Sequence, residues 1–263
     1  MRDAVQFNHH QKMSRREFMT RMAVLGASVA VAPSFFTEKA LGSQSDETLA
    51  ALTRGIVWTG QASVKIPGLG ANVYVDPYKV KTQDKADLVM ITHSHDDHLS
   101  SSSLEKICHN QTTIIAPADV ASKMKRIPQK ETLVVKPGDK VTVNNLTVEA
   151  VPMYNVKKTQ CHPKSKNWVG YVITGNGVSV YHAGDTERIP EMDQIHCDIA
   201  LLPLGQKYTM NSVEEAAESA RAVHAKIAVP IHFGIYEGSQ KDAVKFKDLL
   251  SGQMEVVILE RSN

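Results

Sequence analysis

The segment HSHDDH at residues 93–98 constrains this chain more than any other feature, because it places four potential metal ligands within six residues. It directly follows the apolar run DLVMIT at 87–92, which predicts a buried strand that ends in a loop. Alternate side chains of an extended segment share one face, so His93 and His95 can converge on a single ion. A polar loop that is rich in histidine by chance is the simpler interpretation, but this spacing directly after a strand favours a metal site.

A second pair of potential ligands completes the segment. Asp97 and His98 lie where the chain turns into a helix predicted to begin near Ser100, so they can point toward a second ion. Imidazole nitrogens and carboxylate oxygens suit zinc, manganese or iron, and no cysteine thiolate is needed. The segment therefore predicts a metal centre built from histidine and aspartate.

The rest of the chain alternates between strand-like and helical patterns. Residues 212–224 indicate a helix, because Ser212 can cap its start, Glu215 follows three residues later and alanines fill its body. Residues 242–250 have the apolar spacing of an amphipathic helix that covers a sheet. Strands that alternate with helices predict an α/β fold in layers. Strand-like runs occupy residues 55–58, 71–75, 88–92, 112–116, 141–151, 169–174, 178–181, 199–202, 227–230 and 256–259.

The charge balance argues against a nucleic-acid-binding protein. The chain has 30 Lys and Arg against 28 Asp and Glu, and residues 1–42 hold six of the basic and three of the acidic residues. The remainder has 24 basic and 25 acidic residues, so it is nearly neutral. A binder of nucleic acid would need a broad basic surface, and we expect none here.

The amino terminus resembles a twin-arginine export signal. The segment SRREFMT at 14–20 precedes an apolar run at 22–31 that is too short for a membrane span. Small residues before Ser43 predict cleavage there, which makes residues 1–42 a removed signal and residues 43–263 the mature domain. We therefore expect a periplasmic or otherwise exported protein that meets the twin-arginine translocation machinery. A basic start to a cytoplasmic protein is the alternative.

The cysteines add little to this interpretation. There are three, Cys108, Cys161 and Cys197, so at most one internal disulfide can form. The sequence has no Cys-x-x-Cys pair, which argues against a cysteine-rich structural zinc site.

Further positions carry a resemblance to a known family. His-x-His-x-Asp-His after a buried strand resembles the second signature of the metallo-β-lactamase superfamily. The similarity spans roughly residues 55–260, and YHAGDT at 181–186 and LPLG at 202–205 are similar to metal-dependent hydrolases related to ascorbate-6-phosphate lactonase. The superfamily also has an aspartate at an earlier strand end, a Gly-Asp pair and a late histidine, which match Asp76, Gly184-Asp185 and His232.

The resemblance implies a four-layer αβ/βα sandwich with two divalent ions. Asp185 would bridge these ions. Asp76 would lie behind the ligands, where it accepts a hydrogen bond from an imidazole and fixes its tautomer. A turn aspartate before Pro77 is the alternative for Asp76. The remaining ligands would be His93, His95 and His162 for one ion, and Asp97, His98 and His232 for the other.

The third ligand of the first ion is the open position in this set. Many relatives place a histidine soon after a Val-Pro-x-Tyr segment, but here VPMY at 151–154 is followed by Asn155. His162 is the nearest histidine and is the expected ligand. Asn155 and Cys161 remain alternatives.

The resemblance implies a hydrolase with two ions, zinc before manganese or iron. A hydroxide shared by the ions would attack an ester, lactone, amide or phosphodiester bond of a small molecule, with Asp97 and Asp185 as the catalytic carboxylates. An anionic substrate is one expectation, because four lysines surround His162: Lys157, Lys158, Lys164 and Lys166.

Two other functions stay open. A mononuclear iron dioxygenase of the same fold, acting on persulfides, would need only two histidines and an aspartate and would leave Asp97, His98 and His232 without a role. A non-catalytic metal-binding protein on a degenerate fold is the second, kept open by Asn155. β-Lactam hydrolysis is not expected, because authentic metallo-β-lactamases usually have cysteine or serine where Asp185 stands.

Overall fold

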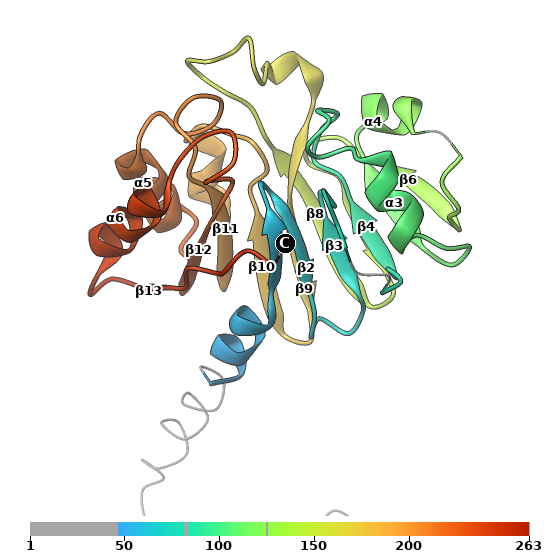
Figure 1. Ribbon diagram of the computed structural model, residues 1–263, viewed down its shortest axis with the longest axis horizontal. Helices are drawn as coiled ribbons and strands as arrows, with labels where there is room; N and C mark the ends of the chain where they lie inside the picture. The colour runs from blue at the N-terminus through green and yellow to red at the C-terminus, as the bar shows by residue number, and fades with distance from the viewer. Residues whose placement is uncertain (1–46, 82–83, 125, 263) are drawn as a thin grey trace, which may run out of the picture. The chain divides into compact units, whose positions relative to one another are not determined.

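Two mixed β-sheets pack face to face, and helices cover the outer face of each (Figure 1). The computed structural model describes residues 47–81, 84–124 and 126–262, so the predicted export signal at 1–42 lies outside the described residues. The first sheet has six strands in chain order: β1 (Val57–Gly60), β2 (Ser63–Ile66), β3 (Val73–Val75), β4 (Leu88–Met90), β5 (Thr113–Ala116) and β6 (Glu131–Val134).

The second sheet has seven strands, and its order runs backward along the chain from β13 to β7. Its strands from β10 to β13 are parallel to one another, as are β3 to β6 of the first sheet. Its members are β7 (Lys140–Val143), β8 (Leu146–Pro152), β9 (Val169–Gly175), β10 (Val178–His182), β11 (Ile199–Pro203), β12 (Ile227–Ile231) and β13 (Glu255–Val256).

The alternation of side chains along the strands fills both faces of the first sheet. In β4, Leu88 and Met90 pack in the core between the sheets, whereas Val89 packs under the outer helices. Successive side chains of a strand point to opposite faces, and both faces are covered here, so the run is apolar throughout. The hydroxyl of Tyr171 in β9 joins the sheets, because it donates to the backbone oxygens of Ile91 and Ile115 at 2.7 and 3.2 Å.

Two helices begin where the sequence predicts, one near Ser100 and one at the cap Ser212. Ser100 precedes α3 (Ser101–Ile107), and its hydroxyl accepts a hydrogen bond from the Ser103 backbone. Ser212 caps α5 (Val213–Ala222) in the same way through the Glu215 backbone N–H. With α4 (Ala118–Lys123) on the first sheet and α6 (Gln240–Leu250) beside α5 on the second, these helices complete four layers and confirm the predicted αβ/βα sandwich.

One predicted strand is two strands in the structure, and several elements were not predicted. The run predicted at 141–151 is a hairpin, in which β7 and β8 meet at Asn144 and Asn145. Both asparagines have positive φ, of 49° and 65°, as a tight hairpin turn requires. The elements without a prediction include β2, α4, β6 and the helical residues 47–55.

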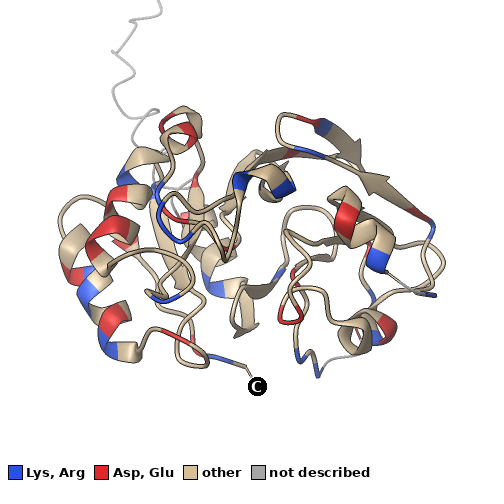
Figure 2. Ribbon diagram, turned by 90° about the horizontal axis from the view of Figure 1, so that it is seen from above, with Lys and Arg blue, Asp and Glu red and all other residues tan. Residues whose placement is uncertain are grey.

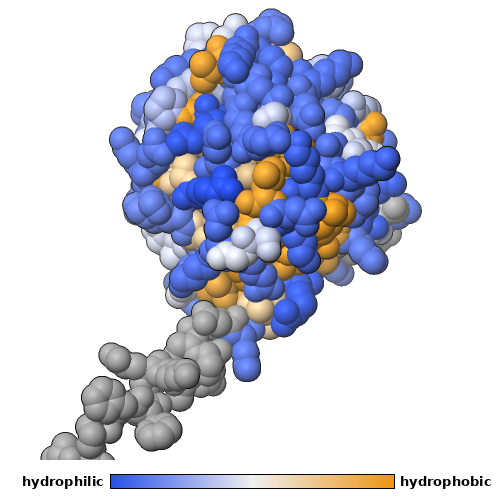
Figure 3. Space-filling view, turned by 90° about the vertical axis from the view of Figure 1, so that its left-hand side faces the viewer, coloured by the Kyte–Doolittle hydropathy of each residue, from blue (hydrophilic) through white to orange (hydrophobic). Residues whose placement is uncertain are grey.

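The surface of the second helical layer is polar. Charged residues lie along α5, where they are mostly acidic, and α6, where basic and acidic residues mix (Figure 2), and Glu214 of α5 forms an exposed ion pair with Lys245 of α6. Figure 3, which faces this side, shows a mainly hydrophilic surface with smaller apolar areas. Within the described ranges, no helix is long and apolar enough to cross a membrane.

Candidate metal centre

Strand ends from both sheets bring the predicted site residues together. Asp76 follows β3, the segment 93–98 follows β4, Asp185 follows β10 and His232 follows β12. Ligands of α/β proteins bind beyond the carboxyl ends of parallel strands, where loops from neighbouring strands converge. The chain turns sharply at Gly184, which has φ +63°, and a side chain there would clash with Met153.

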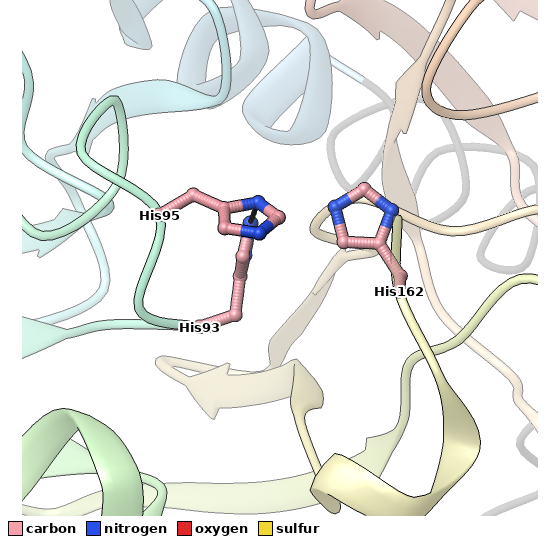
Figure 4. Close-up of side chains that lie close together, drawn as sticks. All are labelled: His93, His95 and His162. Carbon is pink, nitrogen blue, oxygen red and sulfur yellow. Dashed lines mark hydrogen bonds between the residues drawn. The ribbon is translucent and has the colours of Figure 1, made fainter. Parts of the chain in front are cut away.

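One cluster contains His93, His95 and His162. Their ligating nitrogens lie within 4.8 Å of one another. His93 Nε2 is 3.0 Å from His95 Nδ1, and the ring centroids of both lie 5.1 Å from that of His162. Figure 4 shows the imidazole of His162, on its own loop, facing the other two across a gap. Three imidazoles in this arrangement are the donor set of a transition-metal site.

A second cluster contains Asp97, His98 and His232, and Asp185 lies between the two clusters. The donor atoms of the second cluster also fall within 4.8 Å of one another. Asp185 Oδ2 is 3.3 Å from His98 Nε2 and 3.1 Å from His232 Nε2. The same oxygen is 3.6 Å from His162 Nε2 in the first cluster. One carboxylate therefore faces imidazoles of both clusters, which is the position the resemblance implies for a bridging ligand.

The Nδ1 atoms of three of these imidazoles contact side chains outside the two clusters. His98 Nδ1 lies 2.8 Å from Asp76 Oδ2, so the contact expected of Asp76 is present. His232 Nδ1 lies 2.9 Å from Glu237 Oε1. His162 Nδ1 is 3.2 Å from the side-chain amide of Asn155. The Asp76 carboxylate can only accept, so it favours an N–H at His98 Nδ1 and leaves His98 Nε2 facing the site, as in metal centres where a second group fixes the tautomer. The Glu237 carboxylate, at ion-pair distance from His232 Nδ1, favours the same tautomer there.

Buried atoms without partners indicate that the residues fit metal ions. His98 Nε2, His162 Nε2 and Asp185 Oδ1 are fully buried, and none has a hydrogen-bond partner among the described residues. An unsatisfied buried polar atom is costly, and one explanation for such atoms is an ion or a water molecule beside them. All three belong to the clusters, so a cation among them would satisfy donor atoms that the protein leaves open.

Burial lowers the pKa of histidines in the first cluster, whereas nearby carboxylates raise the pKa of those in the second. Burial lowers the pKa of His93 well below its ordinary value, and it lowers the pKa of His162 to about 4. Burial also acts to lower the pKa of His232, but Asp185 and Glu237 outweigh it and raise that pKa to about 10. The Asp185 and Asp76 carboxylates likewise outweigh burial at His98, whose pKa lies well above its usual range. These pKa shifts favour neutral imidazoles in the first cluster and protonated imidazoles in the second when no metal is bound.

Binding of a cation at the second cluster would therefore release protons, whereas binding at the first cluster would release almost none. At pH 7 a group with a raised pKa, such as His98 or His232, must lose its proton before its nitrogen can bind a cation. We expect calorimetric titration of zinc into the metal-free protein, in buffers of different ionisation enthalpy, to show about two protons released in one step and almost none in the other. The affinity of the proton-releasing step should rise as the pH rises toward 10. Equal proton release in both steps would contradict this assignment.

Buried glutamates fix the loops that carry the ligands. Glu187 accepts hydrogen bonds from the backbone N–H groups of residues 156–158, at 2.6 to 2.9 Å, and so holds the start of the loop that reaches His162. Glu237 accepts from the backbone of Lys207 and Tyr208, both at 2.7 Å, in addition to its contact with His232. Neither glutamate has a signal in the sequence, because each acts on segments that are distant along the chain.

Other histidine, cysteine and lysine residues near the site lie outside the clusters. The ring of His182 bonds the Ala62 backbone oxygen at 2.7 Å and accepts from Gly184 N–H, so it is a satisfied core histidine. Cys161 is in no metal-binding group of the described residues. Lys158 bonds Met210 and Asn211, and Lys164 pairs with Glu191, so these two lysines serve loop contacts.

A cavity of about 540 Å³ opens over the clusters. Its wall includes the phenols of Tyr78, Tyr208 and Tyr236, together with Gln160. The hydroxyls of Tyr78 and Tyr236 are 2.8 Å apart, so they join two loops across the wall. None of the described residues that line this cavity is a lysine or arginine. The cavity has the size of a small-molecule site and an aromatic wall with polar tips.

The two-sheet sandwich with these clusters defines a metal-dependent enzyme of the metallo-β-lactamase fold, and comparison with known proteins agrees. Residues 55–232 match the family described as the β-lactamase superfamily domain. A UPF0173 metal-dependent hydrolase of Methanopyrus kandleri is 30% identical over 224 residues, which cover 78% of this chain and 96% of the relative. A second one, from Thermoplasma acidophilum, is 33% identical over 211 residues, covering 74% and 89%.

Solved structures give the same result. A crystal structure from Parabacteroides distasonis, assigned as a metal-dependent hydrolase, has a TM-score of 0.68 and 33% identity, covering 77% of this chain and 91% of that one. A metallo hydrolase from Ignicoccus hospitalis has a TM-score of 0.65 at 22% identity, covering 79% and 95%, and supports the fold alone. The chain therefore belongs to the UPF0173 metal-dependent hydrolases of the metallo-β-lactamase superfamily.

Proposed function

We propose that this metal-dependent hydrolase is an exported enzyme that uses two divalent ions to cleave an ester, lactone or phosphodiester bond of a small molecule. The observation that carries the proposal is the presence of two groups of three donor residues that share no member, with Asp185 close to histidines of both. A persulfide dioxygenase with one iron would leave the second group without a role. Zinc is the proposed metal, since imidazole and carboxylate ligands suit it.

The residues of the chain would bind and orient these ions. His93, His95 and His162 are neutral at pH 7 and would hold one ion, while Asp97, His98 and His232 would hold the other, with Asp185 shared. When bound, two such ions lower the pKa of a water molecule and polarise a carbonyl or phosphoryl oxygen.

Side chains that contact the proposed ligands then hold the imidazole rings in one orientation. Asp76 and Glu237 hold the rings of His98 and His232, which orients the nitrogens that face Asp185. The Tyr208 phenol in the cavity wall can donate a hydrogen bond to a substrate oxygen. These groups position and orient the reacting atoms, which is the chain's own contribution to the chemistry.

The substrate range and location are further parts of the proposal. We propose lactones as the first substrates to test, because YHAGDT and LPLG resemble segments of metal-dependent hydrolases related to ascorbate-6-phosphate lactonase. Export rests on the twin-arginine pattern at 14–20. Because no lysine or arginine is among the described residues that line the cavity, any preference for an anionic substrate would come from the bound cations.

The test is a hydrolysis screen of lactones, esters and phosphodiesters with protein reconstituted with zinc or manganese. We expect at least one class to be hydrolysed, the activity to disappear after chelation and to return when the metal is restored. Hydrolysis that survives complete removal of metal would contradict the proposal, as would persulfide oxidation by an iron-loaded protein that hydrolyses none of the three classes.

A further inference from the structure

Gln61 reaches the metal centre from the turn between β1 and β2. It is fully buried, and its backbone has φ +49°, a left-handed conformation that is unfavourable for a residue with a side chain. Gly60 before it has φ +116°, and a side chain there would lie 2.9 Å from Ile235. The turn thus depends on glycine at position 60, while position 61 keeps a long polar side chain in a backbone conformation that glycine adopts more easily.

The backbone of Gln61 is tied to the loop of a proposed ligand. Its carbonyl oxygen accepts hydrogen bonds from Trp58 Nε1 at 2.7 Å and from the backbone N–H of His232 at 2.8 Å. His232 also has positive φ, of 55°. Gln61 and His232, which both have a left-handed backbone, are therefore joined at the site. This hydrogen bond fixes the position of the Gln61 backbone, from which the side chain extends.

The side chain of Gln61 ends between two members of the second cluster. Its amide nitrogen lies 3.1 Å from Asp97 Oδ2 and 3.1 Å from His232 Nε2. An ionised carboxylate only accepts hydrogen bonds, so the amide must present its N–H to Asp97. The amide oxygen is buried and has no partner among the described residues. Such an unpaired acceptor points to a water molecule or cation beside it.

Asp97 is the member of the cluster that most needs such a contact. Its side chain is 21% exposed, whereas those of His98 and His232 are 0% and 2% exposed. The two histidines are already fixed by Asp76 and Glu237. The Asp97 oxygens lie 3.8 Å from His98 Nε2 and His232 Nε2, which is too far for a hydrogen bond. Without Gln61 this partly exposed carboxylate could rotate toward solvent, and ordering it would then cost free energy each time a cation binds.

We propose that Gln61 is a positioning residue of the metal centre: it holds the Asp97 carboxylate and thereby sets the divalent-cation affinity of the Asp97–His98–His232 cluster. It leaves the His93–His95–His162 cluster unaffected, because it contacts none of those residues. The inference rests on the proposed two-ion function. It requires no change in the fold, since the backbone contacts of residue 61 do not depend on its side chain.

Two variants distinguish the effect of the Gln61 side-chain amide from the effect of its strained backbone. Gln61→Gly removes the side chain and suits the left-handed backbone, whereas Gln61→Met keeps the length and the strain but cannot donate a hydrogen bond. We expect zinc titration against a chromophoric chelator to give two binding constants for the wild type. In both variants one constant should weaken by about 10- to 100-fold and the other should stay unchanged. Asn144→Gly changes a left-handed residue of the distant β7–β8 turn and should alter neither constant.

Each alternative result of the zinc titration would contradict a specific claim. Two unchanged constants in both Gln61 variants would overturn the role of Gln61 and leave the two-ion function standing. Equal weakening of both constants would also overturn it, because that result indicates a general structural defect. A wild type that binds a single ion would overturn the two-ion function, and the inference about Gln61 would fall with it.

Discussion

Replacing Asp185 by alanine should abolish hydrolysis, with a loss of roughly 10³-fold or more, and should lower the metal content at both clusters. The carboxylate oxygen of Asp185 lies within 3.6 Å of His98, His162 and His232, so its removal takes a shared donor from two sites at once. Elemental analysis and turnover, measured on the same preparation, test both parts of this expectation.

A second variant at position 185 is needed that preserves the shape of the site. Asp185 balances the positive charge of His98 and His232, and breaking a buried ion pair is costly, so Asp185→Ala can also destabilise the metal-free protein. Asp185→Asn keeps the size and removes the charge, and we expect the same loss of activity from it. Asp193→Ala, at an exposed carboxylate that pairs with Arg188, should leave metal content and turnover unchanged. Turnover that survives both Asp185 variants would rule out the bridging role.

Replacing His162 by alanine should reduce the metal content from two ions to about one and lower turnover strongly. His162 supplies the third imidazole of its cluster, and its pKa of about 4 shows that the ring is neutral and ready to bind a cation at pH 7. The ion at the Asp97–His98–His232 cluster should stay. Metal analysis of the purified variant tests this.

Two control variants decide between His162 and its neighbours. Cys161→Ser should keep both ions, because Cys161 belongs to no donor group of the described residues. His196→Ala should do the same, since His196 is exposed and stacks on His224 away from the site. Unchanged metal content in His162→Ala, together with a loss in Cys161→Ser, would transfer the ligand role to the thiol.

The fold could be predicted wherever one pattern dominated a segment. Runs such as residues 88–90 are apolar because both faces of the first sheet are covered, and Ser212 predicts the start of α5 through its cap. The boundary between β7 and β8 was missed because the two asparagines of the turn interrupt a run with strand character on both sides. The strand β2, SVKI, alternates between polar and apolar residues, but it has only four residues, which is too short a run for the pattern to stand out.

The candidate site was predictable where its residues form a local motif. The segment 93–98 supplies four of the proposed ligands from one loop, so their spacing alone predicts that they lie together. Gln61 and Glu237 give no such signal, because each acquires its role only when separate loops meet at the strand ends. Gln61, for example, lies 36 residues from Asp97 along the chain.

The metal content per chain tests the central claim most directly. It should be measured by elemental analysis of protein purified without chelators and without an affinity histidine tag. The account predicts two equivalents of divalent metal, with zinc foremost, divided between the clusters that flank Asp185. A single equivalent of iron, or no metal even after reconstitution, would contradict it.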